Sequence, residues 1–104
     1  MELLKKIFGK QPETDYMTLV NEGASILDVR TKAEYAEGHV PDSLNIPLRE
    51  LNKAQMQKHL PVDKPVIICC QSGMRAGQAK RLLENEGYNN VFNVGNWASL
   101  MKKI

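Results

Sequence analysis

VIICCQSGMR, residues 66–75, predicts a buried strand that leads through a short loop into a helix. The apolar run at 66–68 has the composition of a strand buried on both faces. It delivers two thiols, Cys69 and Cys70, to a loop containing Gly73, and a helical pattern follows directly. Backbone N–H groups at a helix N-terminus bind anions, and the helix dipole favours negative charge there. The stretch is therefore the candidate site, and it suits a nucleophile acting on an anionic substrate.

Strand-like and helical patterns alternate along the rest of the chain. Because strands separated by helices form parallel sheets covered on both faces, the predicted fold class is α/β with a central parallel sheet. Ligands of such sheets bind beyond the carboxyl ends of the strands, where both cysteines lie. Strands are expected at 25–29, 44–46, 66–69 and 91–94. A first helix is expected between an N-cap at Asp15 and a stop at Gly23, and a second, at 32–37, after an N-cap at Thr31. Further helices are expected at 48–59, 74–86 and 97–103. The helix at 74–86 should bury one face, made of Ala76, Ala79, Leu82 and Leu83.

Length and composition bound the class of protein. The 104 residues predict one domain, and the 42% apolar and 25% charged shares are ordinary for a globular protein. A net charge of +2 is too small to indicate nucleic acid or an anionic membrane as a partner. The expected organisation is a short amphipathic extension at residues 1–10 and a single domain at 11–104. The extension is too short and too interrupted by Lys5 and Lys6 for a signal-peptide core or a membrane span.

The two cysteines indicate reduced thiols rather than a disulfide or a metal site. Adjacent cysteines close almost no loop, so a disulfide between them would stabilise little. The two histidines, His39 and His59, have no spacing to the cysteines that resembles a zinc pattern. We therefore expect a cytoplasmic protein without a metal or another cofactor.

Strand alternation separates the roles of the two thiols. Cys69 should point into the sheet as a small core residue, whereas Cys70 should open the loop as the nucleophile. A free cysteine is only a few per cent thiolate at neutral pH. The helix N-terminus, together with Arg75 if its guanidinium faces the loop, would favour the thiolate. No histidine base is then needed.

These residues carry a resemblance to single-domain rhodanese-like sulfurtransferases, from about Asp15 to Ile104. Any one matching segment would be a weak signal, but their order and spacing together are highly specific. The segments are Ile26-Leu27-Asp28-Val29-Arg30 with Glu34-Tyr35, Gly38-His39-Val40-Pro41 leading to Asn45-Ile46-Pro47-Leu48, Cys70-Gln71-Ser72-Gly73-Met74-Arg75, and Val94-Gly95-Asn96-Trp97.

The resemblance implies a sulfurtransferase whose cysteine takes sulfane sulfur from thiosulfate or a similar anionic donor. On this chain Cys70 would carry the sulfur as a persulfide and pass it to cyanide, a thiol or an acceptor protein. The loop residues Gln71, Ser72, Gly73, Met74 and Arg75 would bind the substrate, with Arg75 contacting the anionic donor. A persulfide anion is stabilised by the same donors that favour a thiolate.

The remaining family segments have structural interpretations. Asp28, Arg30 and Glu34 are expected to stabilise a strand-to-helix turn as a short ion-pair network, and His39 to make a structural hydrogen bond. Trp97 is expected to pack, with the possibility that it walls the site. Asn96 replaces a second glycine of the family, so we expect it to adopt the left-handed conformation that asparagine tolerates. Asp42 is expected on a surface loop.

Two other functions stay open at this point. The first is a cysteine phosphatase or arsenate reductase, whose loop is one residue longer between cysteine and arginine than the stretch from Cys70 to Arg75. Counting from Cys69 restores that length but places the glycine one position too late. The second is a carrier module that passes persulfide sulfur between proteins with little turnover of small donors.

Overall fold

The computed structural model describes residues 14–104, so the predicted extension at residues 1–10 lies outside it. A single domain over 11–104 remains a prediction. The elements follow the expected alternation of helices and strands. In chain order they are α2 (Tyr16–Asn21), β1 (Ser25–Asp28), α3 (Lys32–Ala36), β2 (Leu44–Asn45), the 3-10 helix η1 (Leu48–Glu50), α4 (Lys53–His59), β3 (Val66–Cys70), α5 (Met74–Asn85), β4 (Val91–Asn96) and α6 (Trp97–Met101).

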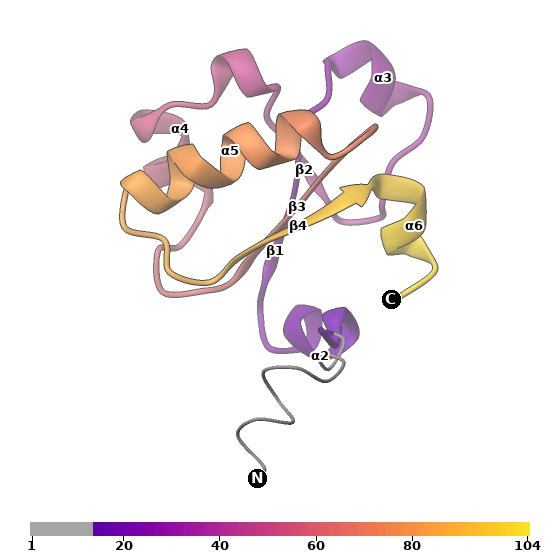
Figure 1. The fold of residues 1–104 in the computed structure, drawn as a ribbon, viewed down its shortest axis with the longest axis horizontal. Coiled ribbons are helices and arrows are strands. Elements are labelled where there is room, and N and C mark those ends of the chain that lie inside the picture. The colour runs from indigo at the N-terminus through magenta and orange to yellow at the C-terminus, as the bar shows by residue number, and fades with distance from the viewer. Residues whose placement is uncertain (1–13) are drawn as a thin grey trace, which may run out of the picture.

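The four strands form one parallel sheet in the order β2-β1-β3-β4. Helices α4 and α5 lie on one side of this sheet, and α2 and α6 lie on the other (Figure 1). The expected α/β fold with a central parallel sheet and helices on both faces is confirmed. The carboxyl end of β3, the start of α5 and α3 come together at one end of the molecule (Figure 1).

Each face of the sheet has its own hydrophobic core. The face under α4 and α5 is packed by Leu27, Ile68 and Cys70 together with residues from those helices, among them Met56, Ala76, Ala79 and Leu83. The face under α2 and α6 is packed by Ile26, Ile67, Cys69 and Leu100, with Leu19, Val20 and Trp97 around them. The strand β3 is buried along its whole length, as its apolar run predicted.

Three details of the predicted elements are corrected. Leu82 is 40% exposed, so the buried face of α5 consists of Ala76, Ala79 and Leu83. The helical stretch expected at 48–59 is interrupted after Glu50, because Asn52 caps a new helix by accepting a hydrogen bond from the Gln55 N–H. The strand β3 extends one residue further than expected and ends at Cys70 itself.

A bulge in β4 sets the register next to the candidate loop. Ile68 lies opposite Asn93, but the following residue, Cys69, lies opposite Gly95. Gly95 has a φ of 76°, the left-handed conformation that such bulges commonly place at a glycine. The extra residue brings Asn96 opposite Cys70.

Candidate active site

The candidate site begins where β3 ends. Cys70 is the last residue of β3, and the loop starts at Gln71 rather than at Cys70 as expected from the sequence. Cys69 and Cys70 are both fully buried and both free thiols. Because side chains alternate across a strand, they pack into the cores on opposite faces of the sheet. Cys70 alone faces the side on which α5 begins.

Gly73 connects the loop to the helix and to the sulfur. It has a φ of 97°, as its predicted role in a turn requires, and it precedes the first residue of α5. Its N–H donates a hydrogen bond to Cys70 Sγ at 2.8 Å. A Cβ at this position would also lie 3.4 Å from Gly95 Cα. Both the backbone conformation and the close approach of β4 therefore favour glycine.

Two asparagines of β4 hold the loop from outside. Asn93 Nδ2 donates to the Gly73 carbonyl at 3.0 Å, and Asn96 Nδ2 donates to the Gln71 carbonyl at 2.9 Å. Asn96 Oδ1 also accepts from the N–H of Ala98 and caps α6. The expected left-handed conformation of Asn96 is wrong, since its φ is −74°; the left-handed residue is Gly95. An asparagine just before a short helix was the signal for this cap.

Arg75 is paired with a residue of α3. Its Nη1 and Nη2 donate to the two carboxylate oxygens of Glu34 at 2.8 and 3.0 Å. This hydrogen-bonded ion pair holds the pKa of Glu34 down at about 2, and it raises the pKa of Arg75. The sequence placed Glu34 in a network with Asp28 and Arg30 instead. Its carboxylate belongs to the Arg75 pair, and only its backbone carbonyl accepts from Arg30 Nη1.

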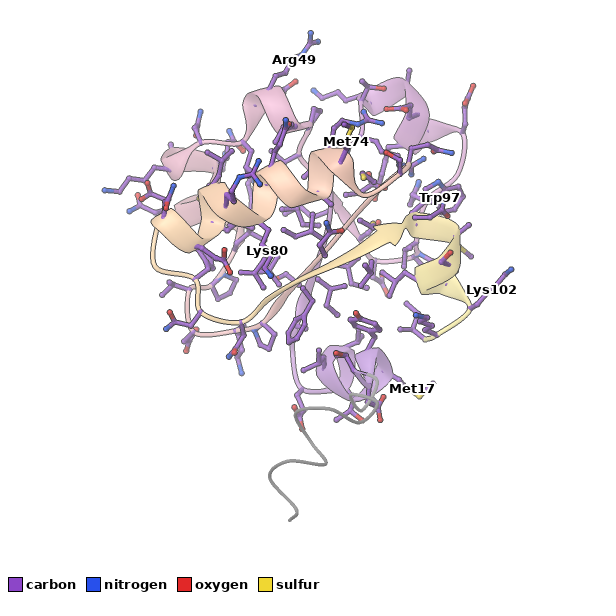
Figure 2. The ribbon with its side chains drawn as sticks, in the orientation of Figure 1. Met17, Arg49, Met74, Lys80, Trp97 and Lys102 are labelled. Atoms are coloured by element: carbon purple, nitrogen blue, oxygen red, sulfur yellow. The ribbon has the colours of Figure 1, made fainter. Side chains whose placement is uncertain are left out.

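Asp28 and Arg30 form a buried ion pair at the end of β1, as expected for that turn. Arg30 Nη2 donates to Asp28 Oδ2 at 2.7 Å and also to the Gly38 carbonyl at 2.7 Å. The Arg30 guanidinium lies 4.6 Å from the centroid of the Trp97 ring. Trp97 therefore packs against a charged group of the turn as well as against the core, at the start of α6 (Figure 2).

The other predicted residues of the loop lie at the surface. Gln71 and Ser72 are exposed, and Met74 is 78% exposed at the start of α5 (Figure 2). His39 stands apart from the loop: its Nδ1 is 2.7 Å from the Tyr35 carbonyl, and its ring stacks on Tyr35. The structural interpretation of His39 is therefore supported. Asp42 is exposed with a φ of 65°, as the surface loop predicted.

Cys69 is in an environment that keeps its thiol protonated. Burial is the main reason that its pKa is raised to about 12, and the nearby negative charge of Asp28 contributes to that rise. The Cys70 sulfur instead accepts a backbone hydrogen bond at a helix N-terminus. Donation of this kind stabilises negative charge on sulfur. The two thiols thus differ in chemistry as well as in the face they occupy.

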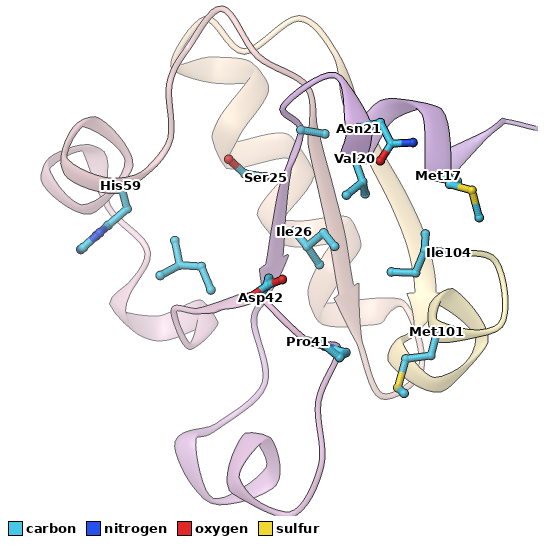
Figure 3. A pocket seen from close by; sticks show the side chains of 12 residues that line it. Met17, Val20, Asn21, Ser25, Ile26, Pro41, Asp42, His59, Met101 and Ile104 are labelled. Atoms are coloured by element: carbon cyan, nitrogen blue, oxygen red, sulfur yellow. The ribbon is translucent and has the colours of Figure 1, made fainter.

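A separate apolar cavity of about 740 Å³ has neither cysteine among its lining residues, whose side chains are drawn in Figure 3. It is lined by α2, the start of β1, the segment 41–44 and the C-terminal end of the chain, with Met17, Val20, Ile26 and Met101 among its residues. Within residues 14–104, no three His, Cys, Asp or Glu side chains are placed to hold a metal ion. In the same part of the chain, every helix is too short or too polar to cross a membrane.

The fold and the site together define a class of protein: a small α/β domain in which a central parallel strand ends at a buried cysteine, and the following loop leads into the N-terminus of a helix. Comparison with known proteins gives the family. The model of the rhodanese-like domain matches residues 13–99, and the chain therefore belongs to the rhodanese-like domain family.

Relatives and solved structures agree with this assignment. A sulfurtransferase of Allochromatium vinosum is 40% identical over 73 residues, which cover 70% of this chain and 66% of the relative. A thiosulfate:glutathione sulfurtransferase of Saccharomyces cerevisiae is 30% identical over 101 residues, covering 86% of this chain and 66% of the relative. A solved rhodanese with anions from E. coli superposes with a TM-score of 0.66 at 32% identity, over 73% of this chain and 89% of that one. The chain thus spans just under two thirds of the length of both curated relatives.

Proposed function

We propose that this protein is a sulfurtransferase that moves sulfane sulfur from thiosulfate or a similar donor to a thiol or cyanide through a persulfide on Cys70. The observation that carries the proposal is the 2.8 Å hydrogen bond from the Gly73 N–H to Cys70 Sγ. A backbone N–H that donates to Cys70 Sγ at the N-terminus of the 12-residue helix α5 would stabilise a negative charge on that sulfur. Its sulfurtransferase relatives support the same chemistry.

The reaction we propose has two displacements. In the first, the Cys70 thiolate attacks the outer sulfur of thiosulfate, the S–S bond of the donor breaks, and sulfite leaves with the bonding pair. Cys70 then holds a persulfide anion. In the second, the acceptor attacks the outer sulfur, the new S–S bond breaks, and Cys70 returns to the thiolate. Cyanide leaves as thiocyanate, and a thiol leaves as its persulfide.

The loop residues have proposed roles in these steps. The loop of Gln71, Ser72, Gly73, Met74 and Arg75 would surround the outer sulfur, with its backbone N–H groups stabilising the persulfide anion. Arg75 would contact an anionic donor. Asn93 and Asn96 would act as positioning residues, because they hold the carbonyls of Gly73 and Gln71. No step draws on a cofactor, and we propose a cytoplasmic location because both thiols must stay reduced.

A persulfide carrier that serves other proteins is the second candidate. The observation that favours it is Met74, a large apolar side chain that is 78% exposed beside the candidate loop. Exposed apolar side chains next to a reactive group are suited to contact with a protein surface. Under this alternative Cys70 would still hold the sulfur, but small acceptors would turn over slowly.

The phosphatase alternative has less support. Its longer loop would have to be counted from Cys69, and that side chain packs into the core on the opposite face of the sheet from the start of α5. Hydrolysis of an aryl phosphate that depends on either cysteine would nevertheless revive it.

An intact-mass experiment tests the proposal. Wild-type protein is incubated with thiosulfate and weighed, and cyanide is then added. We expect a gain of one sulfur, roughly 32 Da, that cyanide removes as thiocyanate. Cys70→Ser should abolish the gain, and Cys69→Ser, the matched control at the adjacent position, should retain it.

Each other outcome has a defined meaning. Sulfur that follows Cys69 would overturn the assignment of Cys70, and a wild-type protein that gains no sulfur would overturn the function itself. A persulfide that forms but gives little thiocyanate would replace the enzyme with the carrier.

A further inference from the structure

We propose that Glu34 determines which sulfur donors the site accepts, because it occupies the Arg75 guanidinium in competition with anionic donors. Donors with two negative charges are disfavoured relative to donors with one. This inference rests on the proposed function, since it requires that donors react at Cys70.

The contact between Glu34 and Arg75 uses the groups that an anion would need. Both terminal nitrogens of Arg75 donate to the carboxylate, one to each oxygen, at 2.8 and 3.0 Å. This fork-to-fork arrangement is the same one through which arginine binds other planar or multi-oxygen anions. A sulfonate-type group of a donor would therefore have to displace Glu34 to bind end-on through both terminal nitrogens of Arg75.

Glu34 is held in place independently of Arg75. Its Oε1 accepts from the Thr31 N–H at 2.9 Å and from Thr31 Oγ1 at 3.1 Å, and the Thr31 hydroxyl caps α3 in return. This reciprocal capping box ties the carboxylate to the first turn of the helix. An incoming anion thus competes with a carboxylate that is already oriented toward Arg75.

The charge of Glu34 is present under all ordinary conditions. With its pKa near 2, the carboxylate is fully ionised at neutral pH. Arg75 lies in the first turn of α5, two residues after Gly73, whose N–H donates to Cys70 Sγ. The positive charge nearest the candidate loop is therefore balanced by Glu34, and a donor approaching Cys70 meets a neutral pair rather than a free guanidinium.

The expected consequence is a dependence on donor charge. Thiosulfate brings two negative charges and expels sulfite. Methanethiosulfonate brings one, and the same attack on its outer sulfur breaks its S–S bond and expels methanesulfinate with the bonding pair. Both reactions leave the same Cys70 persulfide, so they differ in the charge and shape of the anion but not in the product on the protein.

The test compares the two donors in Glu34→Gln. Glutamine keeps the capping box at this position but removes the charge. We expect the second-order rate constant for persulfide formation from thiosulfate to rise roughly fivefold, an effect of the size known for partly exposed ion pairs, and that from methanethiosulfonate to rise less than twofold. The matched control is Glu84→Gln, which makes the same charge change in the surface pair with Lys80 on α5.

For each variant, the rate constants for thiosulfate and for methanethiosulfonate are measured in the same preparation. A smaller folded fraction lowers both rate constants equally, so their ratio does not depend on it. An unchanged ratio in Glu34→Gln, or an equal change in Glu84→Gln, would overturn the role of Glu34 while leaving persulfide formation intact. A wild-type protein that forms no persulfide with either donor would overturn the proposed function, and this inference with it.

Discussion

At the scale of single residues, Cys69 and Cys70 are adjacent and equally buried, yet their surroundings differ. Cys69 packs with Ile26, Ile67 and Leu100, and burial raises its pKa to about 12. Cys70 lies on the other face and accepts a hydrogen bond from the Gly73 N–H. Since the side chains project from opposite faces of one strand, a disulfide between them would require the end of β3 to be distorted.

We therefore expect Cys69 to be unreactive in the folded protein. In Cys70→Ser, iodoacetamide at pH 8 should add no label over hours, because a thiol with a pKa of about 12 is almost wholly protonated at that pH and is also inaccessible. Labelling is followed by intact mass, and the same variant in urea, where Cys69 is exposed, should label within minutes. Rapid labelling of the native variant would contradict the burial argument.

At the scale of elements, the loop between β3 and α5 is held by two other elements, β4 and α3. Gly73 has a positive φ and approaches β4, the asparagines of β4 hold two loop carbonyls, and α3 supplies Glu34 to Arg75. These contacts fix the loop whose Gly73 N–H donates to the Cys70 sulfur, and under the proposed function they would hold that donor in place before a substrate binds. Preorganised donors of this kind are what stabilises charge on a reacting atom.

Two glycines close together in the chain should respond in opposite ways to alanine. Gly73→Ala should destabilise the protein by about 1–2 kcal/mol, because alanine disfavours the left-handed conformation. Gly77→Ala, inside α5, should stabilise it by about 0.5–1 kcal/mol, since the new methyl makes only an ordinary contact with Asn93. Urea denaturation measures both. Equal effects at the two positions would show that the conformation of Gly73 is not what requires glycine.

At the scale of the whole molecule, Arg30 joins parts of the chain that are far apart in sequence. It is 2% exposed, and it contacts Asp28 of β1, the carbonyls of Glu34 and Gly38, and the ring of Trp97 at the start of α6. A Cβ on Gly38 would lie 3.0 Å from that ring. One buried guanidinium thus links the central sheet, the segment around α3 and the C-terminal helix.

Arg30→Leu should be strongly destabilising, by about 3–5 kcal/mol, because it leaves the Asp28 carboxylate buried without its cation. Urea denaturation followed by the fluorescence of Trp97, the single tryptophan of the chain, measures this loss. The double variant Asp28→Asn with Arg30→Leu should recover part of it. A single variant as stable as the wild type would show that the pair is not needed for folding.

Short-range patterns were sufficient to predict much of this molecule. The α/β class, the strand at 66–69, the caps at Asp15 and Thr31 and the turn at Gly73 depend on residues within a few positions of one another. Strand alternation likewise separated Cys69 from Cys70. The physical reason is that periodicity, capping and glycine conformation act through the local backbone.

Contacts across the fold had to come from the tertiary structure. The ion pair of Glu34 with Arg75 joins residues 41 positions apart in the chain. The bulge at Gly95 shifts the register of β4, so that Asn96 lies opposite Cys70 in the sheet. Neither leaves a local pattern, so the sequence assigned Glu34 to the wrong network and Asn96 to the wrong conformation. Local chemistry thus predicted a cysteine beneath a helix N-terminus, whereas packing between α3, α5 and β4 decided which charges surround it.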